Sequence, residues 1–164
     1  MFEASARHGD CYVNPRERGG IMSGEELARE IRHEHEMLAA LMQRLHEDLT
    51  ALRSSWASAR DDLRAVLDHL RRHFALEEEG EFMEDVVQRW PHAASHVEAL
   101  RAEHEQLLRE AKRLMETGDR AIEGRLMSAW ADECLRLLSA IREHDRKENH
   151  LIQEVFCLDV GGGD

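Results

Sequence analysis

Two pairs of residues in this 164-residue chain have the types and the spacing of metal ligands. His73 is followed by Glu77, and His144 by Glu148, four residues further on in each case. Residues four apart share one face of a helix, so each pair can present an imidazole and a carboxylate together. Neutral imidazoles and ionised carboxylates are ligands for iron, manganese or zinc. The pairs therefore predict a metal site carried on helices.

Other chemistries find little support in the sequence. It contains no H-E-x-x-H motif of zinc proteases, no glycine-rich phosphate loop and no G-x-S-x-G nucleophile motif. Ferritin-like di-iron proteins need E-x-x-H on two helices. The chain has this motif once, at Glu30 to His33, which lies off the apolar stripe of its segment. We therefore exclude these classes.

Four segments have apolar residues every three or four positions, which predicts four helices. The stripes span residues 27–56, 63–77, 97–114 and 126–155, with a short helical piece at 82–90. Their expected boundaries are a capping box at Ser23 and Glu26, a turn at Ser54, Ser55 and Ser58, an end or bend at Gly80, a helix start at Pro91, a C-cap at Gly118 and a break at Gly124. Short connections between such helices predict an all-α, up-down-up-down antiparallel four-helix bundle over residues 23–158. Residues 1–22 are expected to form a loose N-terminal arm, and residues 159–164 a disordered tail.

Polar residues interrupt the stripes at one position or pair per helix. The interruptions are His35, the His73 and Glu77 pair, His104, and the His144 and Glu148 pair. The sequence midpoints between successive interruptions, at about residues 55, 90 and 125, fall on or beside the expected breaks. In antiparallel hairpins, residues equidistant from the turn lie side by side, so the six side chains are expected to meet in one layer of the core.

Burying six such groups without partners costs several kcal/mol or more for each ionised one. Hydrogen bonds between histidine and glutamate offset part of this cost, and metal cations offset more of it. Four imidazoles and two carboxylates exceed the needs of one tetrahedral zinc, but they suit two metals bridged by both carboxylates. The layer contains no thiolate, which favours a borderline or hard metal, and we expect iron, with manganese or zinc as the other candidates.

These segments resemble the hemerythrin-like (HHE cation-binding) family, whose motifs appear in order as "EHEML", "HFALEEE", "AEHEQLL" and "HDRKE". The resemblance covers about residues 23–158. It implies a non-haem di-iron centre with a bridging oxo or hydroxo group that binds or reacts with O2, NO or peroxide. The residues it implies as metal ligands are His35, His73, Glu77, His104, His144 and Glu148.

Two features differ from the oxygen-carrying hemerythrins. Those proteins carry H-x-x-x-H on the third helix, whereas the positions four before and after His104 are Leu100 and Leu108. Their fourth helix carries H-x-x-x-x-D, whereas this chain has H-x-x-x-E, as in bacterial HHE sensors and iron–sulfur repair proteins. These differences imply an open iron position and favour sensing, scavenging or iron handling over reversible O2 transport. Two alternatives stay open: a di-iron enzyme that consumes peroxide, and a metal-independent helical interaction module.

Composition limits the partners that we expect. The 22 Lys and Arg residues against 34 Asp and Glu leave a net charge of −12, which disfavours nucleic acid and anionic membrane surfaces. No apolar run reaches the length of a membrane span or follows the first methionine as a signal peptide would, so we expect a cytoplasmic protein. Cys11, Cys134 and Cys157 are too widely spaced to predict a disulfide framework.

The remaining histidines receive separate interpretations. His33 and His150 each lie two residues from a predicted ligand, on the opposite side of the helix, and are expected to face solvent. His69 precedes His73 by four residues and is either a further ligand or a hydrogen-bond partner of the site. The others, expected at the surface, at helix ends or in the arm, are His8, His46, His92 and His96.

Overall fold

The structure is a computed structural model that describes residues 24–50, 56–79, 82–123 and 127–156. Its elements are α1 (Gly24–Thr50), α2 (Trp56–Glu79), α3 (Phe82–Arg89), the short 3-10 helix η2 (Pro91–Ala93), α4 (Ala94–Glu123) and α5 (Met127–Phe156). All of the described residues except Trp90 are helical, which confirms the expectation of an all-α protein. The expected arm and tail lie outside the described residues.

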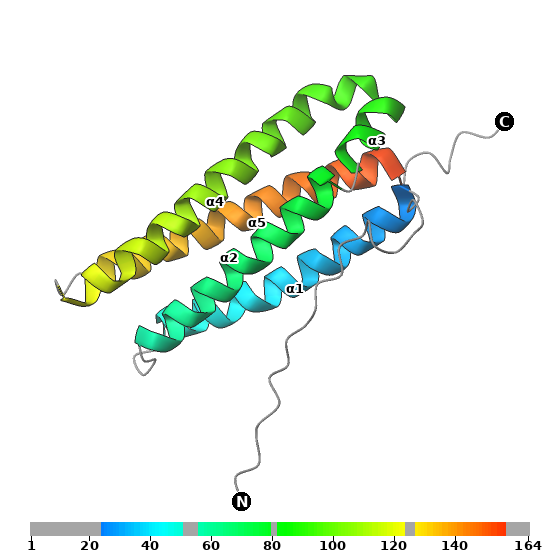
Figure 1. Ribbon diagram of the computed structural model, residues 1–164. Coiled ribbons are helices and arrows are strands. Elements are labelled where there is room, and N and C mark those ends of the chain that lie inside the picture. The colour runs from blue at the N-terminus through cyan, green and yellow to red at the C-terminus, as the bar shows by residue number, and fades with distance from the viewer. Residues whose placement is uncertain (1–23, 51–55, 80–81, 124–126, 157–164) are drawn as a thin grey trace, which may run out of the picture.

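The four long helices lie lengthwise beside one another, and the short α3 sits at one end (Figure 1). Helix α1 contacts α2, α2 contacts α4, α4 contacts α5, and α5 contacts α1. Helix α3 contacts α1, α2 and α4 and so covers one end of this ring of contacts. The arrangement follows from the apolar stripes, because each stripe needs neighbouring helices against which to bury its side chains.

The buried apolar side chains form two separate clusters. The far-end cluster, away from α3, contains Leu38, Met42, Leu45, Ala59, Leu63, Val66, Leu67, Leu70, Phe74, Leu107, Ala111, Leu114, Ala121, Trp130, Cys134, Leu137, Leu138 and Ile141. The α3-end cluster contains Leu27, Ala28, Ile31, Leu76, Phe82, Met83, Val86, Ala93, Val97, Leu100, Leu151, Ile152 and Val155. Along α1 and α4 the chain passes from the α3-end cluster to the far-end cluster, and along α2 and α5 it passes the other way. The polar interruptions of the stripes lie between the two clusters.

Three expected boundaries are wrong. Helix α1 ends at Thr50, whose hydroxyl donates to the carbonyl oxygens of His46 (2.8 Å) and Glu47 (3.2 Å), and Trp56 begins α2 instead of extending the first stripe. Ser58 lies in α2 and not in the turn. Gly118 does not end its helix, since α4 continues to Glu123. An interior glycine costs about 1 kcal/mol, but the continued helix keeps its backbone hydrogen bonds and buries Ala121 in the far-end cluster.

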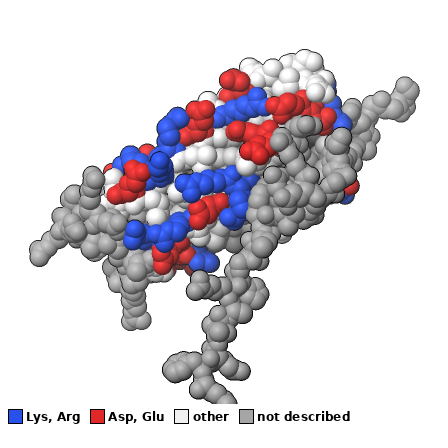
Figure 2. All heavy atoms as spheres, viewed as in Figure 1, with Lys and Arg blue, Asp and Glu red and all other residues white. Residues whose placement is uncertain are grey.

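On the face drawn in Figure 2, acidic and basic side chains are interspersed and do not form separate patches. Elsewhere among the described residues, ion pairs form along one helix, such as Arg109 with Glu105 and Arg146 with Glu143. None of the described helices is both long enough and apolar enough to span a membrane.

Candidate metal centre

All six predicted ligands are buried and lie in two overlapping groups. Their exposed fractions are 7% for His35, 0% for His73, 0% for Glu77, 1% for His104, 1% for His144 and 0% for Glu148. Within each group, the candidate ligand atoms all lie within 4.8 Å of one another. We call the first group position A (His35, His73, Glu77 and Glu148) and the second position B (Glu77, His104 and His144). The structure thus brings together every residue that the sequence analysis placed in one layer.

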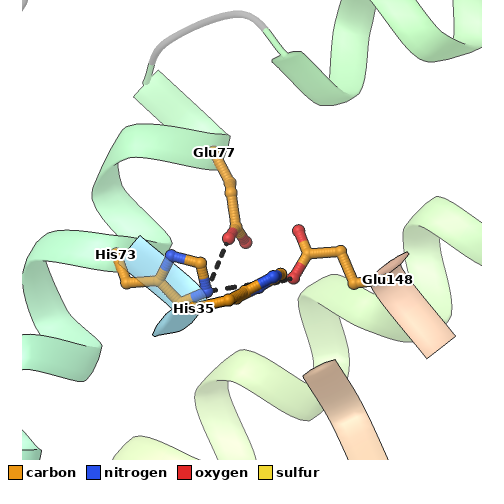
Figure 3. Close-up of side chains that lie close together, drawn as sticks. All are labelled: His35, His73, Glu77 and Glu148. Carbon is orange, nitrogen blue, oxygen red and sulfur yellow. Dashed lines mark hydrogen bonds and ion pairs between the residues drawn. The ribbon is translucent and has the colours of Figure 1, made fainter. Parts of the chain in front are cut away.

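Position A joins α1, α2 and α5, and its four side chains point toward one another (Figure 3). His35 Nε2 lies 3.0 Å from Glu148 Oε2, and His73 Nε2 lies 2.9 Å from Glu77 Oε1. His73 Nε2 is also 3.9 Å from Glu148 Oε2. The periodicity of each helix explains this convergence, because all four residues continue the buried stripes of their helices.

Position B joins α2, α4 and α5. His104 Nε2 lies 3.1 Å from His144 Nε2 and 3.1 Å from Glu77 Oε2. Glu77 therefore directs one carboxylate oxygen toward each position, since its Oε1 faces His73. Glu148 belongs to position A, although its Oε2 also lies 3.9 Å from His144 Nε2. A carboxylate with the placement of Glu77 can bind two cations at once.

At position B, the ring nitrogens that face away from the centre, here called the outer ring nitrogens, contact carboxylates, and these contacts indicate which nitrogens carry protons. His104 Nδ1 lies 2.7 Å from Glu78 Oε1, and His144 Nδ1 lies 3.1 Å from Glu103 Oε2. An ionised carboxylate only accepts hydrogen bonds, so these Nδ1 atoms donate. In the neutral form, which has one N–H group, each ring then has its lone pair on Nε2. The two lone pairs face each other across 3.1 Å and need a cation or a proton between them.

Several buried atoms of the centre have no hydrogen-bond partner among the described residues. They are both ring nitrogens of His73, both carboxylate oxygens of Glu77, and Oε1 of Glu148. His73 Nε2 and Glu77 Oε1 are close, but they are not aligned as donor and acceptor. Buried polar groups in proteins are normally hydrogen-bonded. Ligand atoms that converge without bonding to each other fit a cation, so the donor set suits a pair of metal ions.

Burial and mutual charge shift the pKa values in the centre. Burial lowers the pKa of His73 to about 4 and also lowers the pKa of His144, which keeps both rings neutral. Burial, reinforced by the charge of Glu148, raises the pKa of Glu77 well above its usual range. Burial is also the largest single influence on Glu148 and His35 and opposes their ionisation, but their mutual hydrogen bond and the charges of neighbouring groups together outweigh it. The net effect lowers the pKa of Glu148 to about 2 and raises that of His35 to about 9.

Phe74 lies against the rings of the centre. Its ring is stacked on His104 with centroids 3.9 Å apart and an interplanar angle of 10°. It also meets His144 edge-on, with centroids 5.4 Å apart. Phe74 belongs to the far-end cluster, so the apolar core itself orients these imidazoles.

Other residues that the sequence analysis singled out lie outside the centre. His69 is buried, but its Nε2 lies 3.0 Å from the backbone oxygen of Glu34 and 3.2 Å from its carboxylate, which links α2 to α1. The side chains of His33 and His150 are 68% and 69% exposed, as expected. Cys134 is a free, buried thiol of the far-end cluster, and burial raises its pKa to about 12.

The residues that contact the outer ring nitrogens were not predicted from the sequence. Glu78 and Glu103 are adjacent in sequence to predicted ligands, and Asn149 lies one residue after Glu148. Asn149 Oδ1 lies 3.4 Å from His35 Nδ1. The periodicity placed none of them in the core, and nothing in the sequence distinguished them from the many exposed acidic residues nearby.

Comparison with known proteins yields one match. The family model of the hemerythrin HHE cation-binding domain matches residues 26–156, a span that contains both positions. No curated protein and no solved structure matches the chain. The match covers most of the chain and agrees with the motifs that carried the resemblance. The chain belongs to the hemerythrin HHE cation-binding domain family.

Proposed function

We propose that the six buried residues bind two iron ions, one at each position, with Glu77 and Glu148 as bridging carboxylates. The helices would form the up-down-up-down antiparallel four-helix bundle that the sequence predicts, consistent with the alternating order of the two apolar clusters along α1, α2, α4 and α5. The observation that carries the proposal is the placement of Glu77, whose two oxygens face His73 and His104 from 2.9 and 3.1 Å.

The donor set favours iron. It consists of four imidazoles and two carboxylates, and no cysteine belongs to either position. Nitrogen and oxygen ligands without thiolates suit iron, with manganese and zinc as the other candidates. Two carboxylates also supply two negative charges inside the bundle, which offset part of the charge of two cations.

Bound iron would be redox-active and would have free coordination positions for a small ligand. We therefore propose that the protein binds or reacts with O2, NO or peroxide. The chain's own contribution is to orient the imidazoles and to exclude water. The far-end and α3-end clusters lie on either side of the polar layer, and Leu100, four residues before His104, is 4% exposed. An apolar side chain stands there in place of a further imidazole. These features favour sensing, scavenging or iron handling.

Anaerobic loading with ferrous iron tests the metal assignment. We expect two iron ions per chain after removal of excess metal, and a visible absorption band on oxidation. We also expect thermal stability to rise with metal, by about 2.7 kcal/mol at a hundredfold excess over the dissociation constant. His33→Ala, which removes an exposed histidine, is the matched control. Less than one ion per chain, or melting unaffected by metal and chelator, would contradict the assignment and favour a metal-independent interaction module.

A separate experiment tests reactivity with small ligands. NO and peroxide are added to the ferrous protein without air, and visible spectra and peroxide consumption are recorded. We expect spectral changes and peroxide loss in the natural chain, and a large reduction in His104→Ala. A response that is the same in His104→Ala would count against chemistry at this centre.

A further inference from the structure

The two positions differ in what holds the outer nitrogen of each imidazole. At position B, both outer nitrogens contact carboxylates, at 2.7 Å for His104 with Glu78 and 3.1 Å for His144 with Glu103. At position A, the partner of His35 Nδ1 within the part of the chain that the structure describes is the neutral amide oxygen of Asn149, at 3.4 Å. His73 Nδ1 is buried and has no hydrogen-bond partner among the described residues.

One of the two carboxylates at position B, that of Glu103, is itself held in place. Lys147 Nζ lies 2.5 Å from Glu103 Oε1, which leaves Oε2 for His144. Glu78 is adjacent in sequence to Glu77, so the shared ligand and the residue behind His104 come from the same turn of α2. The stacked ring of Phe74 limits rotation of His104 further. Position B is therefore the more firmly oriented of the two.

An anion behind an imidazole affects the nitrogen that binds the metal. It stabilises the tautomer with the proton on Nδ1, and it raises the electron density on Nε2. A neutral amide at a longer distance does the same much more weakly. Removing such a partner typically lowers metal affinity 10- to 100-fold.

Glu148 favours metal binding at position A, because its Oε2 lies nearer to that position, at 3.0 Å from His35 Nε2 and 3.9 Å from His144 Nε2. His35 also engages this oxygen in a hydrogen bond. Asp145 is a further acidic residue on α5 whose charge acts on His35 and His73. Its buried Oδ1, however, has no hydrogen-bond partner among the described residues.

We propose that Glu78 and Glu103 are positioning residues that make position B the tighter of two unequal metal positions, so that the first ion binds between His104 and His144. The proposal rests on the proposed function, because it assumes that both positions bind metal. It concerns the order and strength of binding and not the reaction.

Anaerobic titration with cobalt(II), followed by its visible spectrum and by calorimetry, tests this order. The natural chain should bind two ions in two resolved steps. Glu78→Gln and Glu103→Gln keep the size of the side chain and remove its charge. Each is expected to weaken the first step at least tenfold and to shift the spectrum of the first bound ion, while the second step changes less than threefold.

Two matched controls separate positioning from general effects of charge or folding. Glu79→Gln and Glu105→Gln remove an exposed charge from the same two helices, next to Glu78 and two residues after Glu103, and should leave both steps unchanged. Thermal melting of the metal-free variants should match that of the natural chain, since a purely structural role would lower it. Equal weakening of both steps, or no weakening of either, would overturn the proposal while two ions still bind. Failure of the natural chain to bind any ion would instead overturn the proposed function.

Discussion

Positions A and B contain the same types of candidate ligand but differ in their surroundings. Each contains two buried imidazoles, and both contain Glu77. Behind the imidazoles of position B stand Glu78 and Glu103, whereas at position A the only such partner among the described residues is Asn149. The comparison teaches that a motif records the candidate ligands but not the groups behind them. Such groups also influence how strongly a site binds metal.

Residues that contact the outer ring nitrogens of the two positions line different surface grooves. Asp145 and Asn149 line a groove of about 600 Å³ between α1 and α5 on the side of position A. Glu103 and Lys147 line a groove of about 450 Å³ between α4 and α5 on the side of position B. Substitutions in one groove therefore test one position at a time, whereas a substitution of Glu77 tests both.

The largest effect is expected for Glu77→Gln, because this carboxylate is shared. The amide keeps the volume but loses the charge that faces both ions, so metal content should fall below one ion per chain, as measured by elemental analysis. The metal-free variant should melt no lower than the natural chain, because it removes a buried carboxylate whose oxygens have no hydrogen-bond partner in the described ranges. Glu79→Gln on the same helix serves as the control. Retention of two ions would show that the positions do not depend on a common ligand.

Separate removal of one imidazole from each position tests their ranking. His104→Ala and His35→Ala should each reduce the metal content from two ions to one. The ion that remains in His35→Ala should bind with the affinity of the first step, and the one that remains in His104→Ala with that of the second, as measured by cobalt(II) calorimetry. His150→Ala, which removes an exposed histidine from α5, should change neither step. If the ion that remains in His35→Ala instead bound with the affinity of the second step, position A would be the tighter position.

The convergence of the ligands was predictable from sequence, whereas the difference between the positions was not. Helical periodicity determines which residues face the core, and equal distances from the turns determine their height, so His35, His104 and the two pairs could be placed together. The partner of an outer ring nitrogen depends instead on side-chain torsions and on small rotations of each helix. Glu78 and Glu103 therefore looked like ordinary exposed acids.

Helix boundaries were less predictable than the site for a related reason. Gly118 is typical of a helix end, but it lies inside α4. Trp56 has the spacing of the first apolar stripe, but it begins α2. Local preferences of this kind amount to about 1 kcal/mol, and the burial of residues such as Ala121 outweighs them. The six ligands, by contrast, lie in the middle of long stripes, where a shifted boundary does not change the face on which a residue lies.

A smaller effect is expected for Phe74→Leu, which removes the ring stacked on His104. Aromatic pairs contribute about 0.5–1.5 kcal/mol beyond their buried area, so the first cobalt(II) step should weaken by up to about tenfold and the second by less. Phe82→Leu removes the same volume from the α3-end cluster and should lower thermal stability without affecting the first step. Equal loss of metal affinity in the two variants would mean that core packing in general, and not the stacked ring, supports position B.

The smallest effect is expected for Asn149→Ala. The contact of Asn149 Oδ1 with His35 Nδ1 is long, at 3.4 Å, and involves a neutral acceptor. A hydrogen bond between neutral groups contributes about 0.5–1.5 kcal/mol even with good geometry, so the second cobalt(II) step should weaken less than threefold and the first should not change. Calorimetry of this variant beside Glu103→Gln measures the difference between an amide and a carboxylate behind a ligand. A loss as large as that of Glu103→Gln would show that orientation of the ring, which both partners provide, matters more than their charge.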